Sequence, residues 1–355
     1  MRQSNFEALR IIAIFMVLMV HSTIAPLGGL PNNSELMSSP GLGAIRCFLG
    51  QFAVPGVDIF ILISGWFGIR LSAKGLCNIL FQVLFYRLLI SVIFYLFIGE
   101  SIFTCIALAI PGYKDWFTAS YLILMALSPF LNSLVDNSPS RAIILIVPLF
   151  AFQFIFGWLI PVWGDFNYGY SAISFTSLYL LARIMRHYSN RIFPYSNPPV
   201  LLRNVSLSIT LIAGIIYLTI FLCPIEIVSG LVRRWDISYT SPINIAIGAV
   251  IILAFSRMNF QNEFINKIAQ SAFAVYLVHE NPLVRPFFRQ IPIDAYASGS
   301  TITYFLTIIS WGAATYILIA MFDRLRIWLW SKLVSAGLID RYSSPIINRI
   351  KRLVA

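Results

Sequence analysis

Long apolar runs separated by short polar segments dominate the pattern of this chain of 355 residues. A helix needs about 20 apolar residues to cross the hydrocarbon core of a bilayer, and the pattern predicts ten such helices. They lie at residues 8–26, 51–70, 78–99, 116–135, 142–161, 170–186, 206–223, 241–256, 268–284 and 302–322. The apolar stretch 101–110 is too short for a span and is expected to be re-entrant or interfacial. The sequence therefore predicts an all-α, polytopic integral membrane protein.

The Lys and Arg residues between the predicted spans lie mainly on the side that also holds the N-terminus. Cytoplasmic segments carry an excess of these residues, so both termini are expected in the cytoplasm. The fewer outer-side charges include Arg285 and Arg289. Residues 1–325 would form a transmembrane domain, and residues 326–355 a basic amphipathic tail on the cytoplasmic face.

The composition agrees with a membrane protein. With 59% hydrophobic and 11% charged residues, the chain could not give a water-soluble globule a normal surface. The net charge of +11 is spread between and beside the apolar stretches, which indicates anionic lipid headgroups and an anionic ligand rather than nucleic acid. The four cysteines show no CxxC or Cys/His pairing, so no metal site is expected.

Two groups that lipid penalises, Arg10 and His21, lie in the first predicted span. An ionisable side chain at mid-membrane costs about 2.5 to 3.5 kcal/mol on insertion scales, so each one suggests a function. Arg10 alone would also suit an anchor that reaches back to the headgroups. Eleven residues of helix, however, bring position 21 to within about 20° of position 10, at a rise of about 16 Å. With Glu7 one turn earlier, one helix face presents an acid and a base near the cytoplasm and an imidazole deep inside.

Other predicted spans place polar residues at comparable depths, in two layers. An inner layer suits phosphate recognition, and a deeper layer suits acid/base chemistry. Their members are Arg10, Arg70, Lys74 and Arg87 in the inner layer and His21, Asp58, His279 and Glu280 in the deeper one. Each also has a structural interpretation: Asp58 could cap a helix or pair with an arginine, and Lys74 could be an ordinary positive-inside residue. His187 is expected in a solvated loop.

Four stretches, taken in order, resemble the acyltransferase 3 family. EALRIIAIFMVLMVHS resembles the opening helix of that family, in which ten residues separate an arginine from a histidine, as they separate Arg10 from His21 here. ISGWFGI, WFTASYLILMALSPFLN and SAFAVYLVHENPL resemble the branch that modifies bacterial surface polysaccharides. Many relatives have an aspartate where this chain has Glu7, and an arginine pair where it has Arg70 and Lys74. The likeness extends to about residue 325.

The resemblance implies transfer of an acyl group, usually acetyl from acetyl-CoA, to a hydroxyl of a sugar in a surface glycan or a lipid-linked precursor. It implies that His21 is essential to the chemistry and that Arg10 binds acyl-CoA, in the bacterial cytoplasmic (inner) membrane. The catalytic set would be His21, Glu280, Asp58 and His279. Donor binding would involve Arg10, Arg70, Glu7, Arg87 and Lys74. Substrate contacts are expected from Trp116, Tyr121 and Tyr276.

Two other classes stay open at this stage. A transporter or flippase for lipid-linked sugars would also need buried polar groups, but the chain shows no internal repeat of the kind that builds many carriers. A polysaccharide polymerase or glycosyltransferase would be expected to carry a large outer loop, and the longest here, about residues 27–50, is modest. An acyl-histidine intermediate is a variant of the transferase mechanism.

Overall fold

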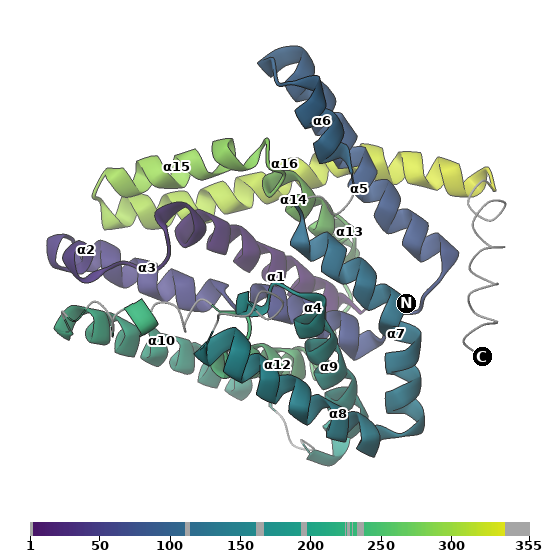
Figure 1. The fold of residues 1–355 in the computed structure, drawn as a ribbon, viewed down its shortest axis with the longest axis horizontal. Coiled ribbons are helices and arrows are strands. Elements are labelled where there is room, and N and C mark those ends of the chain that lie inside the picture. The colour runs from purple at the N-terminus through teal and green to yellow at the C-terminus, as the bar shows by residue number, and fades with distance from the viewer. Residues whose placement is uncertain are drawn as a thin grey trace.

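The computed structural model describes residues 3–110, 114–160, 167–192, 197–223, 225, 228, 230–232 and 238–337. The regular elements in these ranges are all helical (Figure 1). The α-helices are α1 (Ser4–Thr23), α2 (Asn33–Ser38), α3 (Pro40–Ala53), α4 (Gly56–Phe67), α5 (Ala73–Ile93), α6 (Ile102–Ala109), α7 (Trp116–Asn137), α8 (Pro139–Phe152), α9 (Ala172–Ile192), α10 (Pro198–Leu222), α12 (Pro242–Ser256), α13 (Glu263–Ala269), α14 (Ala272–His279), α15 (Arg285–Ala297) and α16 (Thr301–Ser335).

Within the described ranges, seven helical segments are long and apolar enough to cross a membrane. They are Ser4–Leu27, Pro40–Phe67, Ala73–Ile98, Trp116–Asn137, Pro139–Leu159, Pro198–Leu222 and Thr301–Ser335. Large apolar side chains on these segments are exposed; Leu222 and Ile302, for example, are 71% and 72% exposed. Water penalises such a surface and lipid accommodates it. The prediction of an all-α, polytopic membrane protein is confirmed.

The other three predicted spans have different outcomes. Most of 170–186 falls in α9, which begins at Ala172 and carries arginines along its second half. Residues 241–256 match α12, which is apolar but has only 15 residues. The prediction of one helix at 268–284 is wrong, because the chain there forms the end of α13, then α14, and then a turn.

The turn after α14 has a local cause. The Asn281 side chain accepts a hydrogen bond from the Leu283 amide, and the Asn281 carbonyl accepts one from the Arg285 amide. Pro282 lacks the N–H that a continuing helix would use. Helix α14 therefore ends at His279, and α15 begins at Arg285.

Residues 27–50, expected as a loop, are largely helical and form α2 and most of α3. Arg46 of α3 is buried and donates hydrogen bonds to Glu35, to the Tyr296 hydroxyl and to the Gly29 carbonyl, at 3.1, 3.0 and 2.8 Å. Partial burial raises the pKa of Glu35, but the Asn32 amide and the Arg46 guanidinium outweigh it, and the net pKa lies below the ordinary value. These contacts join α2 and α3 to α15.

The apolar stretch 101–110 forms the eight-residue helix α6, which packs against α5. In Figure 1 the two helices project together from the body of the bundle. A helix of this length is too short to cross the hydrocarbon core.

Helix α16 runs without a break across residue 325, where the transmembrane domain was expected to end. Arg326 makes a bidentate pair with Asp323, at 2.8 and 2.7 Å, and the Tyr86 hydroxyl of α5 donates to Asp323 at 2.6 Å. Residues 326–335 therefore belong to α16. Residues 338–355 of the expected tail lie outside the described residues.

Helix α1 lies at the centre of the bundle and packs against α3, α4, α12, α13, α14, α15 and α16 (Figure 1). Its close approach to α4 depends on Gly56, where a Cβ would lie 2.8 Å from the Met16 Cβ and 2.9 Å from the Ala13 carbonyl oxygen. Farther along α4, a Cβ on Gly65 would lie 2.5 Å from the carbonyl oxygen of Tyr179 in α9. Small residues of this kind let helices associate closely in lipid.

Gly65→Ala is expected to lower the stability of the protein by about 1 to 3 kcal/mol, because the added methyl would meet backbone that cannot move aside. Thermal unfolding of the detergent-solubilised protein measures this. The matched control is Gly214→Ala on α10, where an added Cβ meets nothing within 4 Å; helix propensity should leave that variant unchanged or slightly stabilised. Equal melting temperatures for the two variants would contradict the packing argument.

Candidate active site

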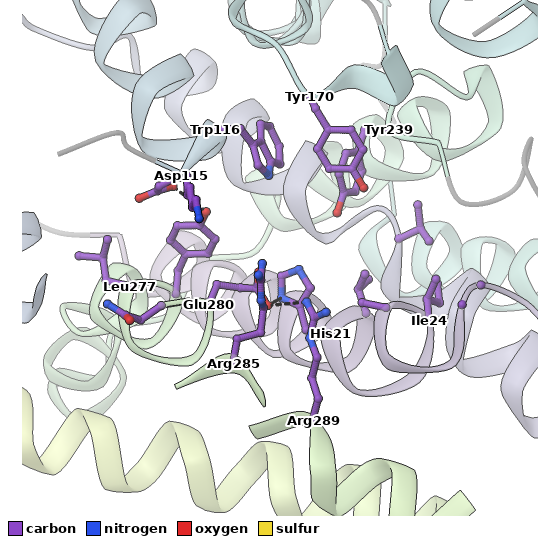
Figure 2. A pocket seen from close by; sticks show the side chains of 18 of the residues that line it. His21, Ile24, Asp115, Trp116, Tyr170, Tyr239, Leu277, Glu280, Arg285 and Arg289 are labelled. Carbon is purple, nitrogen blue, oxygen red and sulfur yellow. Dashed lines mark hydrogen bonds and ion pairs between the residues drawn. The ribbon is translucent and has the colours of Figure 1, made fainter. Parts of the chain in front are cut away.

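A cavity of about 390 Å³ lies between α1, the beginning of α7 and the turn from α14 to α15. His21 and Ile24 line it from α1, and Glu280 lines it from the turn. In Figure 2, Trp116, Tyr170 and Tyr239 lie across the cavity from His21 and Glu280. A cavity of this size and mixed lining is typical of small-molecule sites.

The imidazoles of His21 and His279 are hydrogen-bonded to each other, with 2.9 Å between His21 Nδ1 and His279 Nε2. His279 Nδ1 lies 2.6 Å from the Val275 carbonyl oxygen, one helical turn earlier. A carbonyl only accepts, so His279 Nδ1 carries the proton and its Nε2 accepts from His21 Nδ1. This assignment places the lone pair of neutral His21 on Nε2, the atom left to meet a substrate.

The Glu280 carboxylate joins this pair to two arginines. Its Oε1 lies 3.6 Å from His21 Nδ1 and accepts a hydrogen bond from Arg289 at 2.8 Å. Its Oε2 lies 3.7 Å from Arg285 Nη1. The carboxylate lies where it can stabilise the positive charge that forms when His21 takes a proton.

A second group of polar side chains forms another part of the wall. Arg87 is buried and donates to the carbonyls of Leu108 and Ile110, at 2.7 and 2.8 Å, and to Asp115 at 3.3 Å. The Tyr276 hydroxyl donates to Asp115 at 2.9 Å. The placement of Arg87 in the inner layer is therefore wrong: these contacts hold it in the wall of the cavity that His21 lines. Its acidic partner, Asp115, is 28 residues away in the chain and gives no local signal.

The cavity narrows into an extension of about 30 Å³. Ile14 and Val17 line this neck, and their spacing continues the stripe of α1 that runs from Arg10 to His21. Opposite them lie Phe60 of α4 and Phe117 of α7. The predicted common face of Arg10 and His21 is thus the face along which the cavity extends.

Arg10 and Glu7 form an ion pair at 2.7 Å at the other end of this stripe. Neither residue is among those that line the cavity or the neck. One turn beyond the neck residues of α4 and α7, Ser64 and Tyr121 are hydrogen-bonded at 3.2 Å. Tyr121 therefore lies on the line between the neck and the Arg10 end, and not beside His21.

Three other expected site residues lie away from the cavity. Arg70 and Lys74 are exposed in and just after the connection from α4 to α5. This connection lies at the Arg10 end, because the Phe6 ring of α1 contacts the Trp66 and Phe67 rings with centroids 6.0 and 4.8 Å apart. Asp58 is fully buried, and its carboxyl oxygens have no hydrogen-bond partner in the part of the chain that the structure describes. Of the expected carboxylates, Glu280 is the one beside His21.

Several lining residues were not expected from the sequence. Arg285 and Arg289, which the sequence predicts as outer-side charges, both face Glu280. Their spacing of four residues on a helix, just after Glu280, is a signal that could have indicated a shared face. Tyr170 and Tyr239 come from separate parts of the chain, and their rings meet edge to face with centroids 5.3 Å apart. Nothing in their local sequence predicts this contact.

Three side chains at the cavity, those of His21, His279 and Glu280, also have the spacing of a metal site. One ligand atom each from His21, His279 and Glu280 lie within 4.8 Å of one another. The histidine nitrogens that approach are already hydrogen-bonded, and two arginines lie against the carboxylate. This environment favours a hydrogen-bonded cluster over a cation site.

A family model described as an acyltransferase domain, that of the acyltransferase 3 family, matches residues 3–322 of the chain. The match covers the helices that build the cavity, from α1 to most of α16. No curated protein and no solved structure shows significant similarity.

Asp115→Ala is expected to destabilise the protein by about 1.5 to 3 kcal/mol, since it removes a charged acceptor from the buried Arg87 while two carbonyls remain. The control is Asp136→Ala, which breaks the Arg183–Asp136 pair, whose carboxylate is exposed; such surface pairs contribute about 0 to 1 kcal/mol. Chemical or thermal unfolding compares the two. A larger loss for Asp136→Ala would contradict the assignment of Asp115 as a buried anchor.

Proposed function

The chain belongs to the acyltransferase 3 family, and from this we propose that it transfers an acyl group, expected to be acetyl, from acyl-CoA to a sugar hydroxyl. The acceptor would be a bacterial surface glycan or its lipid-linked precursor. The protein would act in the cytoplasmic (inner) membrane with both termini inside. The described spans support the membrane setting.

One observation carries the catalytic part of this proposal: the hydrogen bonds of His279 leave Nε2 of His21 as the basic atom at the cavity. A general base must carry a lone pair within reach of the hydroxyl proton. Glu280, 3.6 Å from the opposite nitrogen, would stabilise the imidazolium that forms. His279 acts through His21 and is a positioning residue.

In the proposed reaction, His21 Nε2 takes the proton of the acceptor hydroxyl as its oxygen attacks the thioester carbonyl carbon. The C–O bond forms, and the carbonyl electron pair moves onto oxygen. When that pair returns, the C–S bond breaks and the proton on His21 passes to the departing CoA sulfur. The products are the O-acyl sugar and CoA, with no change of oxidation state.

The donor would approach from the Arg10 end. Arg10, Arg70 and Lys74 are positive charges at that end of α1 and suit the phosphates of CoA. Glu7 would hold the Arg10 side chain in place. The neck along Ile14 and Val17 lies between that end and His21, and the long, thin, amphipathic arm of CoA would have to widen it to bring the thioester to His21. Apolar surroundings there would limit hydrolysis of the thioester.

The acceptor would enter the wider cavity from the side of Arg285 and Tyr170. Trp116, Tyr170, Tyr239 and Tyr276 offer it aromatic faces and hydroxyls. A donor from inside could then serve an acceptor outside without crossing the membrane itself. The family match favours transfer over the transporter, flippase, polymerase and glycosyltransferase classes that the sequence left open.

His21→Ala is expected to lower kcat about 10²- to 10⁴-fold, which is the usual contribution of a general base. Labelled acetyl-CoA and surface glycan from a strain lacking the protein provide the assay. His187→Ala is the control, because His187 is exposed and distant in the chain. Full transfer by His21→Ala would end the assignment.

His279→Ala is expected to lower kcat at least about tenfold with little change in the KM for acetyl-CoA, because His21 loses the acceptor that selects its tautomer. The kcat and KM are measured separately across pH. A raised KM with unchanged kcat would instead indicate a role in donor binding.

Arg10→Ala is expected to raise the KM for acetyl-CoA about tenfold or more, since one charge-assisted contact to phosphate is lost. Arg141→Ala, at an exposed position of α8, is the control. Direct binding of CoA to the purified protein separates affinity from turnover. Unchanged affinity in Arg10→Ala would remove this residue from the donor site.

A further inference from the structure

The described side chains that line the cavity carry more positive than negative charge. Four are cationic and two are acidic: Arg87, Lys114, Arg285 and Arg289 against Asp115 and Glu280. A general base and a neutral sugar hydroxyl do not require this excess. An excess of fixed positive charge in a cavity favours a ligand that is itself negative.

Two of the cations are engaged in the wall itself. Arg87 is buried and is held by two carbonyls and Asp115. Arg289 donates to Glu280 at 2.8 Å, and its side chain is 23% exposed. These contacts match each of the two acids with one arginine.

Arg285 differs from both. Its nearest approach to Glu280 is 3.7 Å, longer than a hydrogen bond, and its side chain is 41% exposed. It is also the first residue of α15, where the helix dipole adds positive potential and Pro286 follows without an N–H. The guanidinium can therefore turn to a ligand without leaving Glu280 unpaired, because Arg289 remains.

We propose that Arg285 forms an acceptor-side subsite for an anionic group, a carboxylate or a phosphate, on the sugar that receives the acyl group. This rests on the proposed function, since it assumes that the wide cavity holds the acceptor. Arg285 and His21 approach opposite oxygens of the Glu280 carboxylate. A hydroxyl at His21 and an anion at Arg285 can thus belong to one sugar, or to a sugar and the phosphate that links it.

The subsite would select acceptors by charge. A guanidinium binds a carboxylate or phosphate through two parallel hydrogen bonds, which fixes orientation as well as affinity. With a neutral sugar the guanidinium stays hydrogen-bonded to water, so the sugar lacks this contact and gains no other in its place. Trp116 and Tyr170 on the opposite wall suit the apolar face of a sugar ring that is oriented in this way (Figure 2).

The test uses the full-length protein in nanodiscs and three probes: methyl glucuronoside, glucose 1-phosphate and the neutral methyl glucoside. Binding is measured by calorimetry or ligand-observed NMR at low salt. We expect at least one charged probe to bind about tenfold or more tightly than the neutral one, with affinity falling as salt increases. The better charged probe identifies carboxylate or phosphate as the preferred group.

Arg285→Gln should remove the preference for charged probes, and Arg285→Lys should keep part of it. Arg141→Gln, at an exposed position that does not line the cavity, should keep all of it. If Arg285→Gln does not fold, the salt dependence of the wild-type protein and the Arg285→Lys variant still provide the test. Equal affinity of the wild-type protein for all three probes would overturn the proposal.

A different result would reassign Arg285: if Arg285→Gln raises the KM for acetyl-CoA and leaves probe binding unchanged, the residue serves the donor, and the acceptor subsite is wrong. His21→Ala separates this proposal from the proposed function, because it should lower transfer about 10²- to 10⁴-fold and retain binding of the charged probe. A protein that binds the charged probe through Arg285 but never transfers an acyl group would refute the function alone.

Discussion

One hydrogen-bond chain, from the Val275 carbonyl through His279 to His21, decides which atom of His21 is basic. The carbonyl can only accept, so the two imidazoles have a single consistent arrangement of protons while both are neutral. Other features of the site support these hydrogen bonds. Helix α1 holds His21 at the centre of the bundle, and Glu280 with its arginines lies beside the His21 nitrogen that binds His279. A helix that continued straight past His279 would separate these groups.

The turn between α14 and α15 therefore interrupts the backbone hydrogen bonds of a helix, and it also positions residues of the site. Backbone groups released at a turn cannot be left to hydrocarbon, and irregular backbone at membrane depth occurs only where protein or a cavity surrounds it. Here Asn281 satisfies several of them, through its side chain and its carbonyl. The same turn places Glu280 and Arg285 at the wall of the cavity.

Much of the fold could be predicted because the requirement for spanning lipid is local, and a run of apolar residues satisfies it alone. The face shared by Arg10 and His21 could also be predicted, since helical periodicity is local. The interruption in 268–284 also has a local signal, the turn dipeptide Asn281-Pro282, but the apolar run around it has the pattern of a span and hides that signal. The pairing of Arg87 with Asp115, and the meeting of Tyr170 and Tyr239, depend on how distant segments pack. Asp58 was expected at the site from its depth in the predicted span alone, and depth does not specify the direction in which a side chain points.

The neck along Ile14 and Val17 has a consequence for the membrane itself. If the donor comes from one face of the membrane and the acceptor from the other, as proposed, an open path between them would let protons and salts leak across. A volume of about 30 Å³ holds little more than a water molecule or two, and hydrocarbon from Ile14, Val17 and Phe60 offers a hydrated ion nothing in exchange for its shell. While no donor arm occupies it, the constriction would thus keep the two sides of the membrane electrically separate.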